Sequence, residues 1–248
     1  ETLLILDLYQ QLAEDYLAMP VHIGLKSESE KFAGAEATYC IEALMGDKRA
    51  LQAGTSHNLG QNFAKAFNVT FQTKDNKEEL VYATSWGIST RLVGAVIMTH
   101  GDDKGLRLPP KIAPFQVVVV PIFRDEESMV AVKNYLSPIL SMLRDGGIRV
   151  HEDWRKESPG FKFNEWEMKG VPLRMEVGPK DVKNGKVVLV RRDSGEKLFV
   201  QKDAIGEIVA KLLEDIQKTL FDEAKDFREK NTHRVSSYDD FKDTIVNK

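Results

Sequence analysis

The sequence contains a single cysteine, Cys40, and no long apolar run. One cysteine can form neither an internal disulfide nor a paired-cysteine metal site, and it suits the reducing cytosol, so we expect a cytoplasmic protein. The longest apolar runs, such as Val117–Val120, are far shorter than the ~20 residues that a membrane span needs, so no membrane partner is expected. The sequence itself predicts no signal peptide, because no basic segment is followed by an apolar stretch.

Several motifs that carry common chemistries are missing. The sequence has no GxxxxGK(S/T) phosphate loop, no GxGxxG fingerprint, no HExxH and no GxSxG. It also has no paired cysteine and histidine set for zinc, so no metal site is predicted. Gly101–Gly105 (GDDKG) is acidic, but it lacks the downstream acidic ligand of an EF-hand. We therefore interpret it as a turn at the exit of a helix.

The charge is balanced overall and uneven along the chain. The 248 residues include 35 basic and 38 acidic side chains, a formal net charge of −3. Residues 149–202 hold 13 basic and nine acidic residues, a local surplus that is compatible with a phosphate-backbone partner. A solvated, lysine-rich surface explains the same surplus more simply. The length allows one large domain or two modest ones.

The first part of the chain reads as antiparallel strands with a few helices. Leu4, Leu8 and Leu12 recur at helical spacing near the start. Lys26–Lys31 (KSESEK) reads as a charged loop. The expected elements are a helix over 2–18, a strand pair over 37–44 and 49–53 with a turn at 46–47, a helix over 59–67, a strand over 80–86 and a helix over 90–100.

After Leu108–Lys111 (LPPK) the pattern changes. Two prolines make this segment a stiff linker, so we expect a domain boundary near Pro109–Ala113. The order β-α-β-α-β-β-β-α predicts an α/β sandwich with a mixed sheet. Its expected strands cover 116–122, 148–152, 172–177, 186–192 and 197–201, and its expected helices cover 126–144, 161–168 and 204–221.

The first segment that suggests chemistry is Thr84–Arg91 (TSWGISTR). A strand period of two divides it into two faces, Ser85, Gly87, Ser89 and Arg91 against Trp86, Ile88 and Thr90. Arg91 lies where the strand gives way to a helix, and a guanidinium there can make a forked contact with a polyphosphate. The alternative is a surface arginine at a helix start, where the helix dipole disfavours a cation.

The second segment is Leu51–Phe63. We interpret it as a strand, a Gly-Thr-Ser-His loop and a helix. Donors and acceptors would then gather at a strand end, as in small-molecule pockets, from Gln52, Thr55, Ser56 and His57. The simpler alternative is that Ser56 or Asn58 caps the helix and the others face water.

Together these segments resemble the prolyl-tRNA synthetases of the archaeal and eukaryotic-like type, a class II family. The resemblance spans nearly the whole chain. Its blocks, in order, are KFAG at 31–34, QAGTSH at 52–57, LGQNF at 59–63, SWGISTR at 85–91, THGDDKGL at 99–106, LPP at 108–110, PGFKF at 159–163, EWEMKGVP at 165–172 and GPKD at 178–181.

The resemblance implies an ATP-dependent ligase that joins proline to tRNA(Pro), with magnesium accompanying ATP. Arg91 would match the third-signature arginine, a catalytic residue that holds the far end of a bent ATP. The implied ATP-binding residues are Gln52, Thr55, Ser89 and Arg91, and the implied proline-binding residues are His57, Trp86 and Gly87. The implied anticodon-reading residues are Glu167, Arg174 and Lys197, with weaker backbone candidates at Lys156, Lys162 and Lys169.

The same resemblance implies a fragment. We expect residues 1–111 to be the later part of a class II catalytic domain, 112–218 an anticodon-binding domain and 219–248 the start of a C-terminal extension. The first two class II signatures would lie upstream of Glu1, so this polypeptide alone should not activate proline. A homodimer is expected for the full-length enzyme. The alternative is a non-catalytic tRNA-binding module that keeps the synthetase fold.

Overall fold

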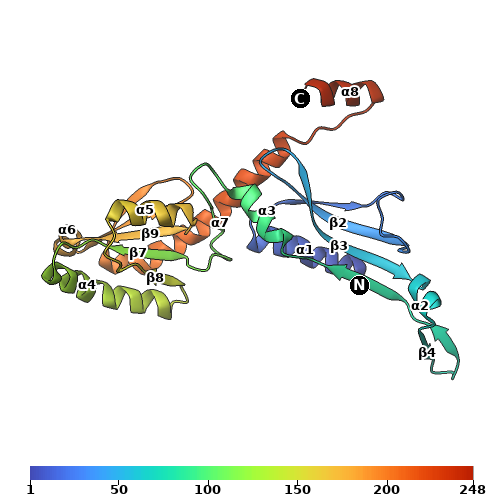
Figure 1. Ribbon diagram of the computed structural model, residues 1–248, viewed down its shortest axis with the longest axis horizontal. Coiled ribbons are helices and arrows are strands. Elements are labelled where there is room, and N and C mark those ends of the chain that lie inside the picture. Colours follow the sequence, from blue (N-terminus) through green and yellow to red (C-terminus); the bar gives the residue numbers. More distant parts are fainter. Residues whose placement is uncertain (248) are drawn as a thin grey trace.

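The computed structural model describes residues 1–247 (Figure 1). Lys248, the last residue of the expected C-terminal extension, lies outside the described residues. The chain forms an N-terminal module of residues 1–111 and a C-terminal module of residues 112–230; the last helix of the C-terminal module reaches back to the first module, and α8 (Tyr238–Asn247) stands apart from both (Figure 1). Among the described helices, none is long and apolar enough to cross a membrane.

The N-terminal module is a four-stranded antiparallel sheet in the order β1-β2-β3-β6, with helices packed on one face. The predicted helix over 2–18 is present, but its end is π-helical. The module contains α1 (Thr2–Gln11), η1 (Leu12–Tyr16), β1 (Val21–Leu25), β2 (Ala37–Leu44), β3 (Ala50–Gly60), α2 (Asn62–Phe67), β4 (Thr70–Gln72), β5 (Glu78–Leu80), β6 (Ala83–Gly87) and α3 (Arg91–His100).

The Gly-Thr-Ser-His loop predicted after residue 53 was wrong, because β3 runs on to Gly60. Thr55 pairs with Cys40 of β2 on one side and with Gly87 of β6 on the other. The hydroxyl of Ser56 is fully buried and donates to the Thr2 carbonyl at 2.8 Å, so its polarity is satisfied inside the fold. Polar residues form a strand here because it is paired on both sides.

The predicted strand over 80–86 is divided in two. Strand β5 pairs with β4 in a separate two-stranded ribbon, and β6 joins the main sheet. Strands β1 and β6 form the two edges of that sheet, so within the described residues each edge strand lacks a second neighbour.

The C-terminal module is a five-stranded mixed sheet in the order β11-β10-β9-β7-β8, which confirms the predicted architecture. Strand β7 runs parallel to β8 and β9, whereas β10 is antiparallel to its neighbours. The module contains β7 (Val117–Pro121), α4 (Glu126–Asp145), β8 (Val150–Glu152), α5 (Pro159–Met168), β9 (Leu173–Val177), α6 (Pro179–Lys183), β10 (Lys186–Arg191), β11 (Lys197–Gln201), η2 (Lys202–Ala204) and α7 (Ile205–Lys230).

Helices cover both faces of this sheet. All five residues of β7 are buried, as its run of valines predicts. Helices α4 and α7 pack on one face, and α5 packs on the other through Trp166 (Figure 1). An Asp125–Ser128 capping box starts α4, and Ser158 caps α5.

Helix α7 is longer than predicted, because it continues from Phe221 to Lys230. The expected division after residue 218 therefore falls within a continuous helix. Beyond Leu220 its side chains meet the N-terminal module: Glu223 pairs with Arg107, and Arg228 donates to the Val21 carbonyl at 2.8 Å. The helix persists because its second half has new partners.

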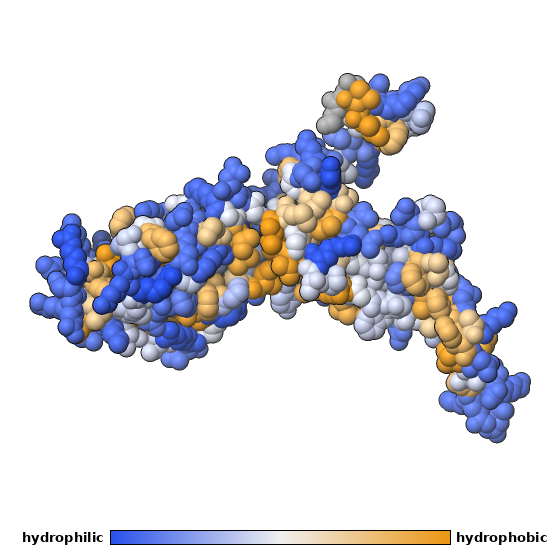
Figure 2. Space-filling model, viewed as in Figure 1, coloured by the Kyte–Doolittle hydropathy of each residue, from blue (hydrophilic) through white to orange (hydrophobic). Residues whose placement is uncertain are grey.

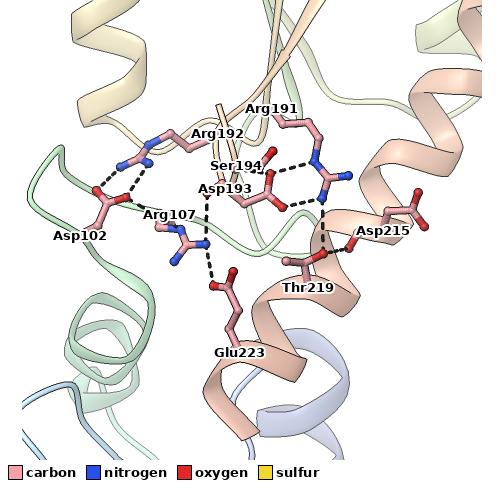
Figure 3. Close-up of polar contacts among 9 residues, drawn as sticks. All are labelled: Asp102, Arg107, Arg191, Arg192, Asp193, Ser194, Asp215, Thr219 and Glu223. Atoms are coloured by element: carbon pink, nitrogen blue, oxygen red, sulfur yellow. Dashed lines mark hydrogen bonds and ion pairs between the residues drawn. The ribbon is translucent and has the colours of Figure 1, made fainter. Parts of the chain in front are cut away.

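A polar junction fixes the segment that follows α3 against the C-terminal module (Figure 3). Arg192 makes a forked contact with Asp102, at 2.6 and 2.9 Å, and Arg107 pairs with Glu223 at 2.8 Å. Arg191 is held in the same way by Asp193. The predicted turn at the exit of α3 is thus confirmed, and it is also an inter-module contact.

Two glycines let this segment approach α5 closely. Gly105 has φ +127°, and a Cβ there would lie 2.5 Å from the Met168 carbonyl oxygen. Gly170 has φ +72°, and its Cβ would meet Leu106 at 2.5 Å. Backbone hydrogen bonds from Leu106 to Met168 and from Leu108 to Gly170 hold the two segments together. Only glycine combines such φ values with this contact.

Candidate functional site

The first candidate site is a cavity of about 320 Å³ in the N-terminal module, between β3 and the turn from β6 into α3. It brings together the four side chains predicted to bind ATP, together with Gly87. The lining residues are Gln52, Ala53, Gly54, Thr55, Gly87, Ile88, Ser89 and Arg91.

Arg91 is the first residue of α3, and its guanidinium lies at the cavity wall. Its Nη1 donates to the Gln52 carbonyl at 3.2 Å, and its backbone N–H donates to the Ser89 hydroxyl at 3.3 Å. The first turn of α3 contains no acidic residue, and the Thr90 side chain does not cap it. A guanidinium at the cavity wall is suited to a polyphosphate.

His57 lies on the same face of β3 as Thr55 and next to the cavity. Its Nδ1 lies 2.9 Å from the Thr38 hydroxyl, and its ring is 5.0 Å from the ring of Phe32. Burial, and then the nearby Lys26 ammonium, lower the pKa of the His57 imidazole. The ring is therefore neutral at pH 7 and can orient a polar ligand by hydrogen bonding.

Trp86 is not brought together with His57. It pairs with Ser56, whereas His57 pairs with Ser85, and directly opposed residues share one face of a sheet. The Trp86 ring therefore lies on the face of α1, with 53% of its surface exposed. The alternation of the strand opposes the predicted role of Trp86 in a proline pocket, whereas Gly87 does lie on the His57 face.

Lys26 is a cation beside this site that was not predicted from the sequence. It lies just after β1, and its Nζ donates to the Gln52 side-chain oxygen. In the sequence it opens the charged run KSESEK, which is typical of a solvated loop. No local signal distinguishes it, because its place beside Gln52 depends on the pairing of β1 with β2.

The second candidate site is a cavity of about 150 Å³ in which all three predicted anticodon residues meet. Arg174 of β9 and Lys197 of β11 both pair with Val190 of β10, so they share one face of the sheet. Glu167 comes from the end of α5, which covers that face. The lining residues are Lys104, Val118, Trp166, Glu167, Val171, Arg174, Val190, Arg191, Arg192, Gly195 and Lys197.

Local contacts hold these side chains in place. Arg174 Nε donates to Glu176 at 3.0 Å, and the guanidinium stacks on the Phe163 ring at 4.4 Å. Phe199, two residues after Lys197, lies on the same face with 71% of its surface exposed. An exposed aromatic ring beside cations is a typical platform for an unstacked RNA base. Period-two alternation from Lys197 could have identified Phe199.

The weaker lysine candidates have different environments. Lys162 is 2% exposed, and its ammonium donates to the Asp153 carbonyl at 2.9 Å, so the prediction that it contacts a nucleic-acid backbone was wrong. Lys169 pairs with Glu165 and lies over the Trp166 ring. The sequence pattern predicts a solvent-exposed lysine at this helix position, but the aliphatic part of the Lys162 side chain is buried in the core.

Within residues 1–247 no cluster of three or more histidine, cysteine or acidic side chains could hold a metal ion. At the first site the lining side chains offer hydrogen bonding and positive charge.

Comparison with known proteins shows which proteins this chain is similar to. Residues 116–215 match the family model described as "Anticodon binding domain". The proline–tRNA ligase of Natranaerobius thermophilus is 54% identical over 97% of this chain, and that of Salinibacter ruber is 54% identical over 97%. The chain is homologous to about half of a prolyl-tRNA synthetase.

A solved structure supports the same assignment. Prolyl-tRNA synthetase from Cryptosporidium parvum, complexed with L-proline and AMP, superposes with a TM-score of 0.93 at 42% identity and covers 99% of this chain. That relative comes from a eukaryote, in line with the predicted type. The fold and the resemblance expected from the sequence motifs are thus confirmed.

The chain spans about half the length of the curated relatives it matches. It covers 50% of the Natranaerobius protein, 49% of the Salinibacter protein and 53% of the Cryptosporidium chain.

Proposed function

We propose that this chain is part of a proline–tRNA ligase, and that it contributes one wall of the ATP and proline site together with the anticodon-reading domain. The observation that carries the proposal is the cavity that gathers Gln52, Thr55, Ser89 and Arg91 at the start of α3. The Cryptosporidium relative was solved with proline and AMP, and the Natranaerobius and Salinibacter relatives are proline–tRNA ligases.

The proposed reaction has two steps. The proline carboxylate attacks the α-phosphorus of ATP, which forms prolyl-adenylate and releases pyrophosphate. The terminal ribose hydroxyl of tRNA(Pro) then attacks the prolyl carbonyl and releases AMP. Both steps transfer a group between oxygens, so catalysis is mainly alignment and neutralisation of phosphate charge.

The described residues divide this work. Arg91 neutralises the far phosphates of a bent ATP. Gln52, Thr55 and Ser89 offer hydrogen-bonding groups that fix the nucleotide. Neutral His57 and the open backbone at Gly87 shape the proline side of the site. Magnesium, when bound to ATP, supplies further charge neutralisation.

The second cavity suits the anticodon. Every proline codon begins with two cytosines, so tRNA(Pro) presents two guanines. The Glu167 carboxylate can accept hydrogen bonds from the guanine N–H groups, and Arg174 and Lys197 can donate to guanine oxygens or to phosphate. Exposed Phe199 offers a stacking surface beside them. The homodimer and the cytoplasmic location stay predictions.

A chimera tests the proposed activity. This chain would replace the matching half of the Natranaerobius ligase, and charging of tRNA(Pro) with proline would be measured. We expect an active chimera whose kcat/KM falls about 100-fold or more on Arg91→Ala, because a preorganised charge contact to the transferring phosphate is lost. The matched control is Arg49→Ala, an arginine in the β2–β3 turn whose side chain is 83% exposed.

The outcomes separate the two functional readings. A chimera that binds tRNA(Pro) but charges none supports a non-catalytic tRNA-binding module. Equal activity of the Arg91 and Arg49 variants would remove Arg91 from the catalytic role proposed for it.

A further inference from the structure

The anticodon cavity has one wall from the N-terminal module. Lys104 lies on the turn that follows α3, and its Nζ is 3.2 Å from a carboxylate oxygen of Glu167. The resemblance to the family pointed only to Glu167, Arg174 and Lys197 in this cavity. We propose that Lys104 is a further specificity-determining residue, which reads a guanine of the anticodon together with Glu167. This inference rests on the proposed function.

The turn that carries Lys104 is fixed on both sides. Its own backbone N–H donates to Asp102 at 2.9 Å, and Asp102 receives the forked contact from Arg192 (Figure 3). Arg192 Nε also donates to the Glu167 carbonyl at 2.8 Å. The buried Arg192 guanidinium thus helps to fix the backbone of both Lys104 and Glu167, so the position of the ion pair is determined by the fold.

The three arginines of the cavity already have partners. Arg174 is held by Glu176, Arg191 by Asp193 and Arg192 by Asp102. The Lys104–Glu167 pair differs because it is open to solvent, with 67% of the Lys104 side chain and 32% of the Glu167 side chain exposed. Exposed ion pairs are weak, so an incoming base can replace the pair with hydrogen bonds of its own.

A carboxylate beside an ammonium matches one base edge. Guanine presents an N1–H donor next to the O6 acceptor on its Watson–Crick edge. Glu167 accepts from N1–H while Lys104 donates to O6, and neither group is left unpaired. Adenine presents an acceptor at N1 and an amine at position 6, so both groups would face the wrong partner. The pair therefore selects guanine over adenine.

Binding of anticodon stem–loop RNA to the full chain tests this assignment. One stem–loop carries the two guanines, and two others carry adenine at one guanine position each. Fluorescence anisotropy gives the dissociation constants for wild type, Lys104→Gln, Lys104→Arg and Arg174→Ala. The matched control is Lys211→Gln, a lysine on exposed α7 surface at the opposite face of the sheet.

We expect Lys104→Gln to bind the two-guanine RNA about tenfold more weakly than wild type. At one guanine position, the loss of affinity that Lys104→Gln shows when adenine replaces guanine should be smaller than that of wild type by a similar factor. Lys104→Arg should keep most of the preference for guanine. Lys211→Gln should behave as wild type. Because the lost ion pair is exposed, the melting temperature of Lys104→Gln should stay within about 3 °C of wild type.

Each of the other possible outcomes would contradict a specific part of the proposal. If Lys104→Gln binds like wild type while Arg174→Ala is impaired, Lys104 has no role and the proposed function stands. If Lys104→Gln weakens all three RNAs equally, it contacts phosphate and the base-reading assignment is wrong. If wild type shows no preference for the guanines, anticodon reading itself fails, and the proposed function fails with it.

Discussion

His100, the last residue of α3, is a buried titratable group outside both cavities. Its Nε2 lies 2.9 Å from the Leu17 carbonyl, to which it donates, and only 3% of the residue is exposed. Burial is the main cause that lowers the pKa of His100 to about 4, and the hydrogen bond to Leu17 partly opposes it. The folded protein thus holds a neutral imidazole that an unfolded chain would protonate near pH 6.5.

This shift makes stability depend on pH. The unfolded state binds the extra proton, so the contribution of His100 is complete above pH 6.5 and is lost as the pH falls to about 4. The loss amounts to roughly 3 kcal/mol of unfolding free energy. Urea unfolding at several pH values should show a smaller decline for His100→Gln, which keeps a donor and does not titrate. His22→Gln, on exposed β1, is the control; equal declines in both variants would contradict the assignment.

At the level of single residues, the sequence predicted the site contacts that are local. Ser89 and Arg91 follow one strand, and Gln52 and Thr55 belong to another, so the members of each pair are close in sequence, while the family resemblance implied their ATP-binding roles. Residues that reach a site across the fold were missed: Lys26 depends on strand pairing, and Lys104 depends on the docking of two modules. Strand alternation opposes the role predicted for Trp86, and it is a purely local rule that the family resemblance outweighed.

At the level of elements, the contact between the turn after α3 and the end of α5 can be tested through Gly105. Alanine there would keep φ +127° and place Cβ 2.5 Å from the Met168 carbonyl oxygen. Gly147 has φ +79°, and a Cβ at that position would meet no atom within 4 Å, so Gly147→Ala isolates the backbone cost alone. We expect about 1 kcal/mol of destabilisation for Gly147→Ala and at least about 2 kcal/mol more for Gly105→Ala.

The same pair of variants links the junction to binding. Gly105→Ala must move the turn away from α5, and Lys104 away from Glu167 with it, so affinity for the two-guanine stem–loop should fall. Gly147→Ala should bind like wild type. Urea unfolding and anisotropy measure the two effects, and equal behaviour of both variants would show that the turn does not need its close contact with Met168.

Element boundaries could be predicted where one module determines them. Helix α4 ends where its glycines predict, and β7 is buried as its valines indicate. Strand β3 and helix α7 are both longer than the sequence predicts, for a common reason. Both continue past the local signal because residues distant in sequence pair with them, Gly87 in one case and Arg107 in the other. Local propensity carries no information about such partners.

At the level of the whole molecule, the two modules differ in how much of their apolar surface they bury. Sixteen large apolar side chains of residues 1–111 are exposed, against six of residues 112–230. Figure 2 shows apolar residues gathered near α2 and the β4–β5 ribbon, where Phe67 and Phe71 lie. The C-terminal module instead surrounds its sheet with helices on both faces. The modules should therefore differ in their ability to fold alone.

Separate expression of the two modules tests this difference. Residues 112–230 contain nearly all of their own hydrophobic core. Among the described residues, Ala18 is the only buried member of the core between the five-stranded sheet, α4 and α7 that comes from the N-terminal module. We expect this piece to be a soluble monomer with a single cooperative urea transition. Residues 1–111 lose the contacts of Gln217 with Asp15 and Tyr16 and that of Arg228 with Val21, and they keep two unpaired sheet edges.

We therefore expect residues 1–111 alone to aggregate or to unfold without cooperativity, because exposed strand edges and apolar side chains favour association between copies. Size-exclusion chromatography and urea unfolding of each piece make the comparison, with the intact chain as the control. A soluble, monomeric and cooperatively folding N-terminal piece would contradict this expectation. It would also mean that the junction of Asp102, Arg107 and Arg192 serves to orient two independent domains, since neither would then need the other in order to fold.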